Sequence, residues 1–291
     1  MNKNGSWLIR REFWENRAIW MIPAVFGGLL LLAALFGRVS IPQLTSPQES
    51  RAAAGAFLGI IGATFFIIMS VYSTWYLLDC LYADRRDRSI LFWKSLPISD
   101  ATTVLIKLLV GMIIIPLVYF AAADATALLA AFILSIRARA AIGSSLWNGE
   151  VWVQMQVLWI YLVVTAAVWY LPIAGWLMLV SAWAKRAVML WAVLPPLLIY
   201  ILERLFFGTK TLGHIVARRL LGLPSVAIHD PQLLWTHGGN VVDNAAATSI
   251  SVWQLINPSG FFTSAETWIG VAVGVVLIAG AIQLRMRRSE I

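Results

Sequence analysis

Two long apolar runs of this chain are separated by the sequence DRRDRSILFWKSLP, residues 84–97. The segment begins with five consecutive charges and then places five large apolar side chains close together, namely Ile90, Leu91, Phe92, Trp93 and Leu96. An aqueous loop gains nothing from such a cluster unless a partner protein or the membrane surface covers it. We therefore expect a short docking helix over about 87–97, capped by Asp87 or Ser89 and ended by Pro97. The alternative is an interfacial helix that lies flat on the inner leaflet.

The apolar runs on either side of this segment determine the class of protein. The chain has 291 residues, of which 60% are hydrophobic and 12% are charged, and its mean hydropathy is +0.80. A soluble domain carries far more polar surface. Several runs reach the ~20 residues that a helix needs to cross the hydrocarbon of a bilayer, and open sheet edges cannot be satisfied in lipid. The composition predicts an all-α polytopic membrane protein with a single membrane domain.

The sequence predicts six membrane-spanning helices, at about 18–37, 56–79, 103–124, 152–183, 188–207 and 265–284. An amphipathic interfacial helix over 6–17 precedes them, and a large external segment over about 208–264 precedes the last. The third run stays apolar to about Ile136, which is too long for one straight crossing. We therefore expect a bend or break near Asp124, or a helix that emerges on the far side. Pro172 is expected to kink the fourth span.

The formal net charge is +8, from 22 Lys and Arg against 14 Asp and Glu. In a membrane protein this excess orients the helices, so no nucleic-acid partner is expected. Six spans place both termini on one side. That side holds 14 of the 22 Lys and Arg residues and the other side holds eight, which predicts cytoplasmic termini in the inner (plasma) membrane. The single cysteine, Cys80, excludes an intrachain disulfide.

Few ionisable residues fall near or within the apolar runs. Asp79, Asp124 and Glu203 are candidate intramembrane acids, which are costly in lipid and often functional. Asp124 is the best candidate for a proton or cation site, and the alternative places it at the outer interface. Three histidines of the external segment, His214, His229 and His237, match no standard zinc spacing, so no metal site is predicted.

Small residues form a strip on the second span at Gly55, Gly59 and Gly62. Such a strip permits the close approach of another helix. Gly270 and Gly274 do the same in the last span. The neighbouring helix belongs either to the same subunit or to a second copy.

No phosphate-binding loop of the form G-x-x-x-x-G-K-[ST] and no H-E-x-x-H motif occurs in the chain. The chain is therefore not expected to hydrolyse ATP or to act as a zinc protease. The energy for any transport then comes from a partner or from an ion gradient.

Taken together, three features resemble the permease subunit of ABC-2 type transporters, the type V exporter fold. They are the N-terminal sequence IRREFWE at residues 9–15, the segment 84–99, and the layout of six spans with a large external region before the last. The resemblance implies that the docking helix is the coupling helix of the family, which fits a groove on a separate ATPase subunit. It implies ATPase contacts by Asp87, Arg88, Ile90, Leu91, Phe92, Trp93, Lys94 and Leu96. It also implies short re-entrant helices near Thr211–Leu223 and Val252–Phe262.

This resemblance predicts a non-catalytic permease subunit of an ATP-driven exporter. The ATP and Mg would be bound by a separate P-loop ABC ATPase. A second permease copy or a paralogue would form the transport pathway together with this chain, surrounded by membrane lipids. The apolar spans favour an amphiphilic, lipid-like, peptide or drug substrate. Two alternatives remain open at this stage. One is an ion-coupled carrier or channel that uses Asp124 and Glu203, and the other is a non-transporting membrane anchor or sensor.

Overall fold

The computed structural model describes residues 3–37, 47–86, 99–137, 146–229 and 252–287. Their helices are α1 (Lys3–Glu15), α2 (Ala18–Phe36), α3 (Pro47–Arg86), α5 (Asp100–Leu109), the π-helical η1 (Val110–Ile114), α6 (Ile115–Arg137), α8 (Gly149–Trp169), α9 (Leu171–Trp183), α10 (Val188–Phe207), α11 (Thr211–Leu221), α12 (Leu223–Ala227), α14 (Val252–Leu255), α15 (Pro258–Thr263) and α16 (Ala265–Arg287). Six of these stretches are long and apolar enough to cross a membrane: α2, α3, the continuous α5–η1–α6, α8, α10 and α16. The prediction of an all-α polytopic membrane protein is confirmed.

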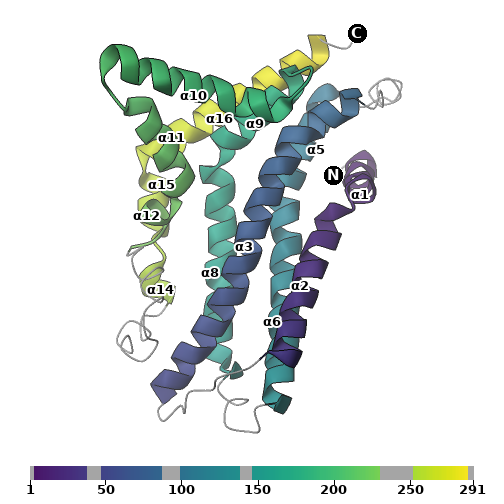
Figure 1. Cartoon of the computed structure of the whole chain (residues 1–291), viewed down its shortest axis with the longest axis vertical. Coiled ribbons are helices and arrows are strands. Elements are labelled where there is room, and N and C mark those ends of the chain that lie inside the picture. The colour runs from purple at the N-terminus through teal and green to yellow at the C-terminus, as the bar shows by residue number, and fades with distance from the viewer. Residues whose placement is uncertain (1–2, 38–46, 87–98, 138–145, 230–251, 288–291) are drawn as a thin grey trace.

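The helices α2, α3, α6 and α8 run side by side along the long axis of the molecule (Figure 1). The last turns of α3 and α16 and the start of α5 lie at one end of this bundle, near α1. We call it the α3–α5 end. The helix α10 lies across the bundle axis at the same end (Figure 1), and Val188 and Ala192 are its buried residues. The expected docking helix, 87–97, falls outside the described residues.

The second span is longer than its apolar run indicates. The helix α3 begins at Pro47 and continues through Arg86, whereas the span expected from the sequence covers about 56–79. The helix extends past its apolar run for a physical reason. Arg85 and Arg86 are favourable in the last turn of a helix, where they face the negative end of the helix dipole, and Asp84 is buried among cations.

The third stretch is helical from Asp100 to Arg137, so a break near Asp124 is wrong, and the expectation of a helix that continues to the far side stays a prediction. The irregularity lies earlier, in the π-helical turn η1. Pro116 has no N–H and its ring crowds the preceding turn, while the Ile115 N–H donates to the Val110 carbonyl instead of the Gly111 carbonyl. The hydroxyl of Ser73 on α3 donates to the carbonyl of Gly111, which satisfies it.

The expected fourth span, 152–183, is two helices rather than one. The chain leaves helical geometry at Tyr170, whose ψ is 4°, and Pro172 occupies the first turn of α9. Proline suits the first turn of a helix because its missing N–H has no partner there. The prediction of a disturbance at this proline is confirmed, but it separates α8 from α9 instead of bending one span.

Parts of both glycine strips contact neighbouring helices of the same chain. A Cβ on Gly62 would lie 2.0 Å from the ring of Trp159 on α8, and one on Gly55 would lie 3.8 Å from Met155 of the same helix, while Gly59 has open space. On α16, a Cβ on Gly274 would lie 2.9 Å from the backbone carbonyl carbon of Leu171. Backbone contacts this close hold α9 and α16 together.

Replacing Gly274 with valine is expected to lower the free energy of unfolding by about 1–3 kcal/mol, because the added carbons force α9 and α16 apart. The measurement is the thermal unfolding midpoint of the purified protein in detergent. Gly28→Val on α2 is the matched control, because a Cβ at Gly28 meets no atom within 4 Å. Equal midpoints for the two variants would contradict this account of the α9–α16 contact.

The described parts of the external segment are helical where the resemblance implies re-entrant helices, at α11–α12 and α14–α15. They form a small core of their own against α8, made of Trp169, Leu223, Ala227, Ile228 and Phe261. The Asn257 side chain caps α15 by accepting the Gly260 N–H at 2.9 Å. Two of these helices, α12 and α14, pack on α8, and α11 leads down toward them from the end of α10 (Figure 1).

Candidate functional site: a buried ion network

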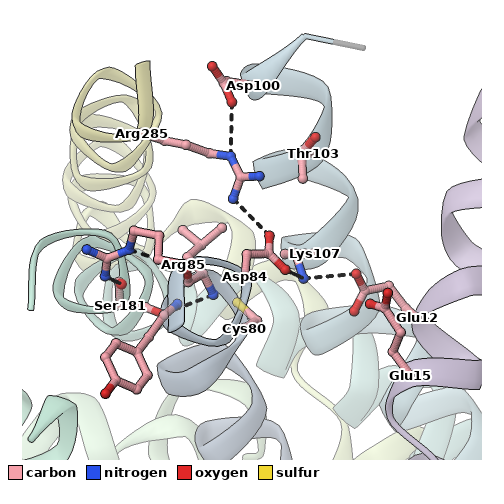
Figure 2. A network of polar contacts seen from close by, with 12 residues as sticks. Glu12, Glu15, Cys80, Asp84, Arg85, Asp100, Thr103, Lys107, Ser181 and Arg285 are labelled. Atoms are coloured by element: carbon pink, nitrogen blue, oxygen red, sulfur yellow. Dashed lines mark hydrogen bonds and ion pairs between the residues drawn. The ribbon is translucent and has the colours of Figure 1, made fainter. Parts of the chain in front are cut away.

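Charged side chains from four helices meet inside the protein at the α3–α5 end (Figure 2). Four of them are almost completely buried: Lys107 is 2% exposed, Glu12 3%, Asp84 5% and Arg285 6%. They come from α5, α1, α3 and α16 respectively. Charged residues are almost never buried to this degree unless they are paired. The site is therefore described through the ion pairs and hydrogen bonds that these four residues make. We call this group, together with Asp100 and Arg11, the ion network.

Local sequence patterns direct these side chains inward. On α1, Leu8 and Glu12 are one helical turn apart and both are buried, whereas Trp7 and Trp14 are exposed. On α5, Thr103 and Lys107 have the same spacing and form one buried face. Residues four apart lie on the same side of a helix. The amphipathic helix α1 thus carries an acid on its protein-facing side, opposite the lysine of α5.

Lys107 is at the centre of the ion network. Its Nζ lies 2.9 Å from Oε1 of Glu12 and 3.3 Å from Oδ1 of Asp84. The second oxygen of Glu12 accepts hydrogen bonds from the Tyr76 hydroxyl at 2.8 Å and from the Asn16 amide at 3.2 Å. Both oxygens of Glu12 are therefore satisfied, as a buried carboxylate requires.

Arg285 connects two further acids. Its Nη1 lies 3.0 Å from Oδ2 of Asp84, and its Nε lies 3.0 Å from Oδ1 of Asp100. Arg11 approaches Asp84 more loosely, with 3.8 Å between Nη2 and Oδ1. The planar guanidinium presents several donors in a fixed arrangement, which lets one arginine hold two carboxylates. Arg11 also pairs with Glu15, at 2.7 Å between Nε and Oε1.

The ion network contains one acid before the segment 87–98 and one acid after it. Asp84 precedes this segment by three residues and Asp100 follows it by two, and Arg285 binds both of them. Arg85, next to Asp84, donates to the carbonyls of Ser181 and Ala184 at the end of α9, the latter at 2.9 Å. The chain on either side of the segment is thus tied to α9 and α16.

This arrangement suits mechanical coupling. Removing one partner of a buried ion pair costs about 3–5 kcal/mol, because the other charge is left buried and unpaired. Separating α1, α3, α5 or α16 from the others would break at least one such contact. The four helices are therefore expected to move together at this end, and a force on the segment 87–98 would reach all of them.

The acids that the sequence singled out have different environments. Asp79 is half-buried on α3 and is not among the residues of the ion network. Asp124 accepts a hydrogen bond at 2.8 Å from the Gln156 amide of α8. Glu203 accepts from the Thr209 hydroxyl and the Thr211 N–H, both at 2.7 Å, so it stabilises the turn between α10 and α11. The proposed docking residues, from Asp87 to Leu96, lie outside the described residues.

From the sequence, Lys107 and Arg285 were expected only to orient the helices, and Glu12 only to belong to the charged face of the interfacial helix 6–17. Lys107 carried the signal for the site, because it lies ten residues after Pro97, inside the run that begins near Thr103. A lysine within an apolar helix needs an acidic partner on a neighbouring helix. The identity of that partner depends on tertiary packing.

A second polar cluster fastens the external helices. The guanidinium of Arg219 lies 4.3 Å from the centre of the Trp169 ring, and its Nη2 donates to the Glu266 carbonyl at 3.1 Å. Burial lowers the pKa of Arg219, and the nearby charge of Glu266 opposes this shift. The Trp169 indole N–H donates to the Arg219 carbonyl at 2.9 Å. These contacts attach α11 to α8 and α16, which is a structural role.

Within the described ranges, no group of three or more His, Cys, Asp and Glu side chains could hold a metal ion. Comparison with known proteins finds no family model, no curated protein and no solved structure that matches this chain.

Proposed function

We propose that this chain is the membrane-spanning permease subunit of an ATP-driven ABC exporter of the ABC-2 type. It would move an amphiphilic, lipid-like, peptide or drug substrate out of the cytoplasm. The observation that carries the proposal is the bridge by Arg285 between Asp84 and Asp100. It connects the chain on both sides of the segment 87–98 to α16. A segment that receives force from a partner needs such a connection in order to pass the force to the membrane helices.

In this proposal the segment 87–98 is the coupling helix and binds a separate P-loop ATPase, which holds the ATP and Mg. Two ATPase subunits approach each other when ATP binds, and each displaces one coupling helix. The ion network passes this displacement to α1, α5 and α16. The result is a two-state, rigid-body change that opens or closes a pathway between two permease copies, or between this chain and a paralogue.

The proposed orientation places both termini in the cytoplasm of a cell whose plasma membrane holds the protein. The excess of Lys and Arg on that side, 14 against eight, supports it. The helix α1 and the last turn of α16 lie near the same end of the bundle (Figure 1), as an even number of crossings requires. The docking segment then faces the cytoplasm, where an ATPase can reach it.

The proposal is tested by the variants Phe92→Asp and Trp93→Asp. Each is expected to abolish co-purification of the ATPase, because burial of one large apolar side chain is worth about 1.5–3 kcal/mol and a buried carboxylate adds a further cost. The measurement is the amount of ATPase recovered with affinity-tagged permease from membranes. Ser95→Asp is the matched control, since it adds the same charge to the segment without removing an aromatic ring. Normal co-purification and ATP-driven transport in both aromatic variants would exclude the proposal.

A second candidate function is an ion-coupled carrier, which is favoured by one observation. Asp124 lines a cavity between α3, α6 and α8. Transport that follows an imposed proton gradient without ATP, and that is lost in Asp124→Asn, would establish this candidate. Co-purification of an ATPase without transport of any cargo would instead indicate a membrane anchor or sensor.

A further inference from the structure

A small cavity lies between α3, α6 and α8, some distance from the ion network. Its volume is about 30 Å³. Aromatic side chains form much of its wall, namely Phe65, Phe66, Tyr119, Phe120 and Trp159. Asp124 and Gln156 are also in the wall, and no Lys, Arg or His is among the lining residues. The wall of the cavity is therefore mainly apolar and aromatic, and it carries one acidic side chain and no basic one.

Three unused hydrogen-bonding groups belong to residues that line this cavity. The hydroxyl of Tyr119 is buried and has no hydrogen-bond partner among the described residues, and the residue as a whole is 1% exposed. A buried hydroxyl without a partner costs about 1–3 kcal/mol. The Gln156 amide N–H donates to Oδ1 of Asp124 at 2.8 Å, so Oδ2 of Asp124 and the Gln156 carbonyl can still accept.

The carboxylate of Asp124 lies within the apolar length of α6 and not at its end. Exposed apolar side chains occur on α6 both before it, at Leu117, and after it, at Leu128, Leu129 and Phe132. A carboxylate at such a position is costly unless a cation compensates it. None of the residues that line the cavity supplies one.

We propose that this cavity binds the head group of a cationic amphiphile, specifically a primary alkylammonium ion. The ammonium pairs with Asp124 and donates to the Gln156 carbonyl, and the surrounding aromatic rings attract the cation. A primary ammonium has three N–H donors for these two acceptors, whereas a trimethylammonium head has none. As a binding site this inference stands alone, and as a cargo site it rests on the proposed exporter function.

The experiment measures binding of radiolabelled dodecylamine to the full chain in nanodiscs of zwitterionic lipid at neutral pH. Asp124→Asn is expected to weaken binding by about tenfold or more, because it removes a charged hydrogen-bonding partner. Glu150→Gln is the matched control, because Glu150 is an exposed acid of α8 that pairs with Arg51 at 3.0 Å and does not line the cavity.

Unlabelled competitors test the selectivity of the same site in the wild-type protein. Unlabelled dodecylamine should displace the probe, whereas dodecanol and dodecyltrimethylammonium should not. Equal displacement by all three compounds, or wild-type affinity in Asp124→Asn, overturns the inference. If Asp124→Asn fails to fold, the competitor series decides the question. The binding assay contains no ATPase, so its result does not depend on the exporter proposal. Charge-selective binding would support this site even if Phe92→Asp recovered a normal amount of ATPase, a result that would count against the exporter.

Discussion

Replacing Lys107 with methionine is expected to lower the free energy of unfolding by about 3–5 kcal/mol, the cost of leaving buried acids without their cation. Methionine keeps most of the length of the lysine side chain. The loss of stability therefore reflects the missing charge and not a change in side-chain volume. Glu12 would then lose the cation that lies 2.9 Å from its Oε1, and Asp84 would lose the one that lies 3.3 Å from its Oδ1. Thermal unfolding in detergent and the yield of folded protein measure the effect.

Two further variants separate the ion network from a general effect of lost charge. Arg218→Met removes a cation from an exposed pair with Glu266, at 2.8 Å, and should cost less than about 1 kcal/mol. The double variant Lys107→Met/Glu12→Gln removes both members of one buried pair, and it should regain part of the stability lost in Lys107→Met. Equal losses in Lys107→Met and Arg218→Met would show that burial of the network is not what stabilises this end.

The variant Arg285→Lys is expected to keep the fold and the bound ATPase but to reduce ATP-driven transport by about tenfold or more, the equivalent of one lost charge-assisted hydrogen bond. Lysine retains the positive charge. It lacks the planar guanidinium whose Nη1 and Nε reach Asp84 and Asp100 together. One end of the segment 87–98 would therefore no longer be held to α16.

Transport of cargo into vesicles that contain permease and ATPase measures this uncoupling, with ATPase recovery measured in parallel. Arg287→Lys is the matched control, because Arg287 is exposed in the same last turn of α16. Undiminished transport in Arg285→Lys would mean that the bridge between Asp84 and Asp100 does not carry force. Loss of ATPase recovery in the same variant would mean that it shapes the docking segment itself.

The positions of the spanning helices were largely predictable, but several of their ends were not. Hydrocarbon thickness requires long apolar runs, and these are visible in the sequence. The charges of residues 84–86 suggested that α3 ends before them, yet the helix continues because its neighbours neutralise Asp84. Likewise, α6 continues past Asp124, whose carboxylate accepts a hydrogen bond from Gln156 of another helix. Polarity marks a helix end only where water, and not protein, surrounds the polar group.

The sequence by itself determined the all-α class, the number of long apolar helices and the amphipathic character of α1, because each depends on residues that are close along the chain. Only the tertiary structure decided which charges meet. Asp84 and Arg285 are 201 residues apart, and each of them alone resembles a charge at the end of a span. A buried pair forms because two helix ends pack together and exclude water, and no local pattern contains that information.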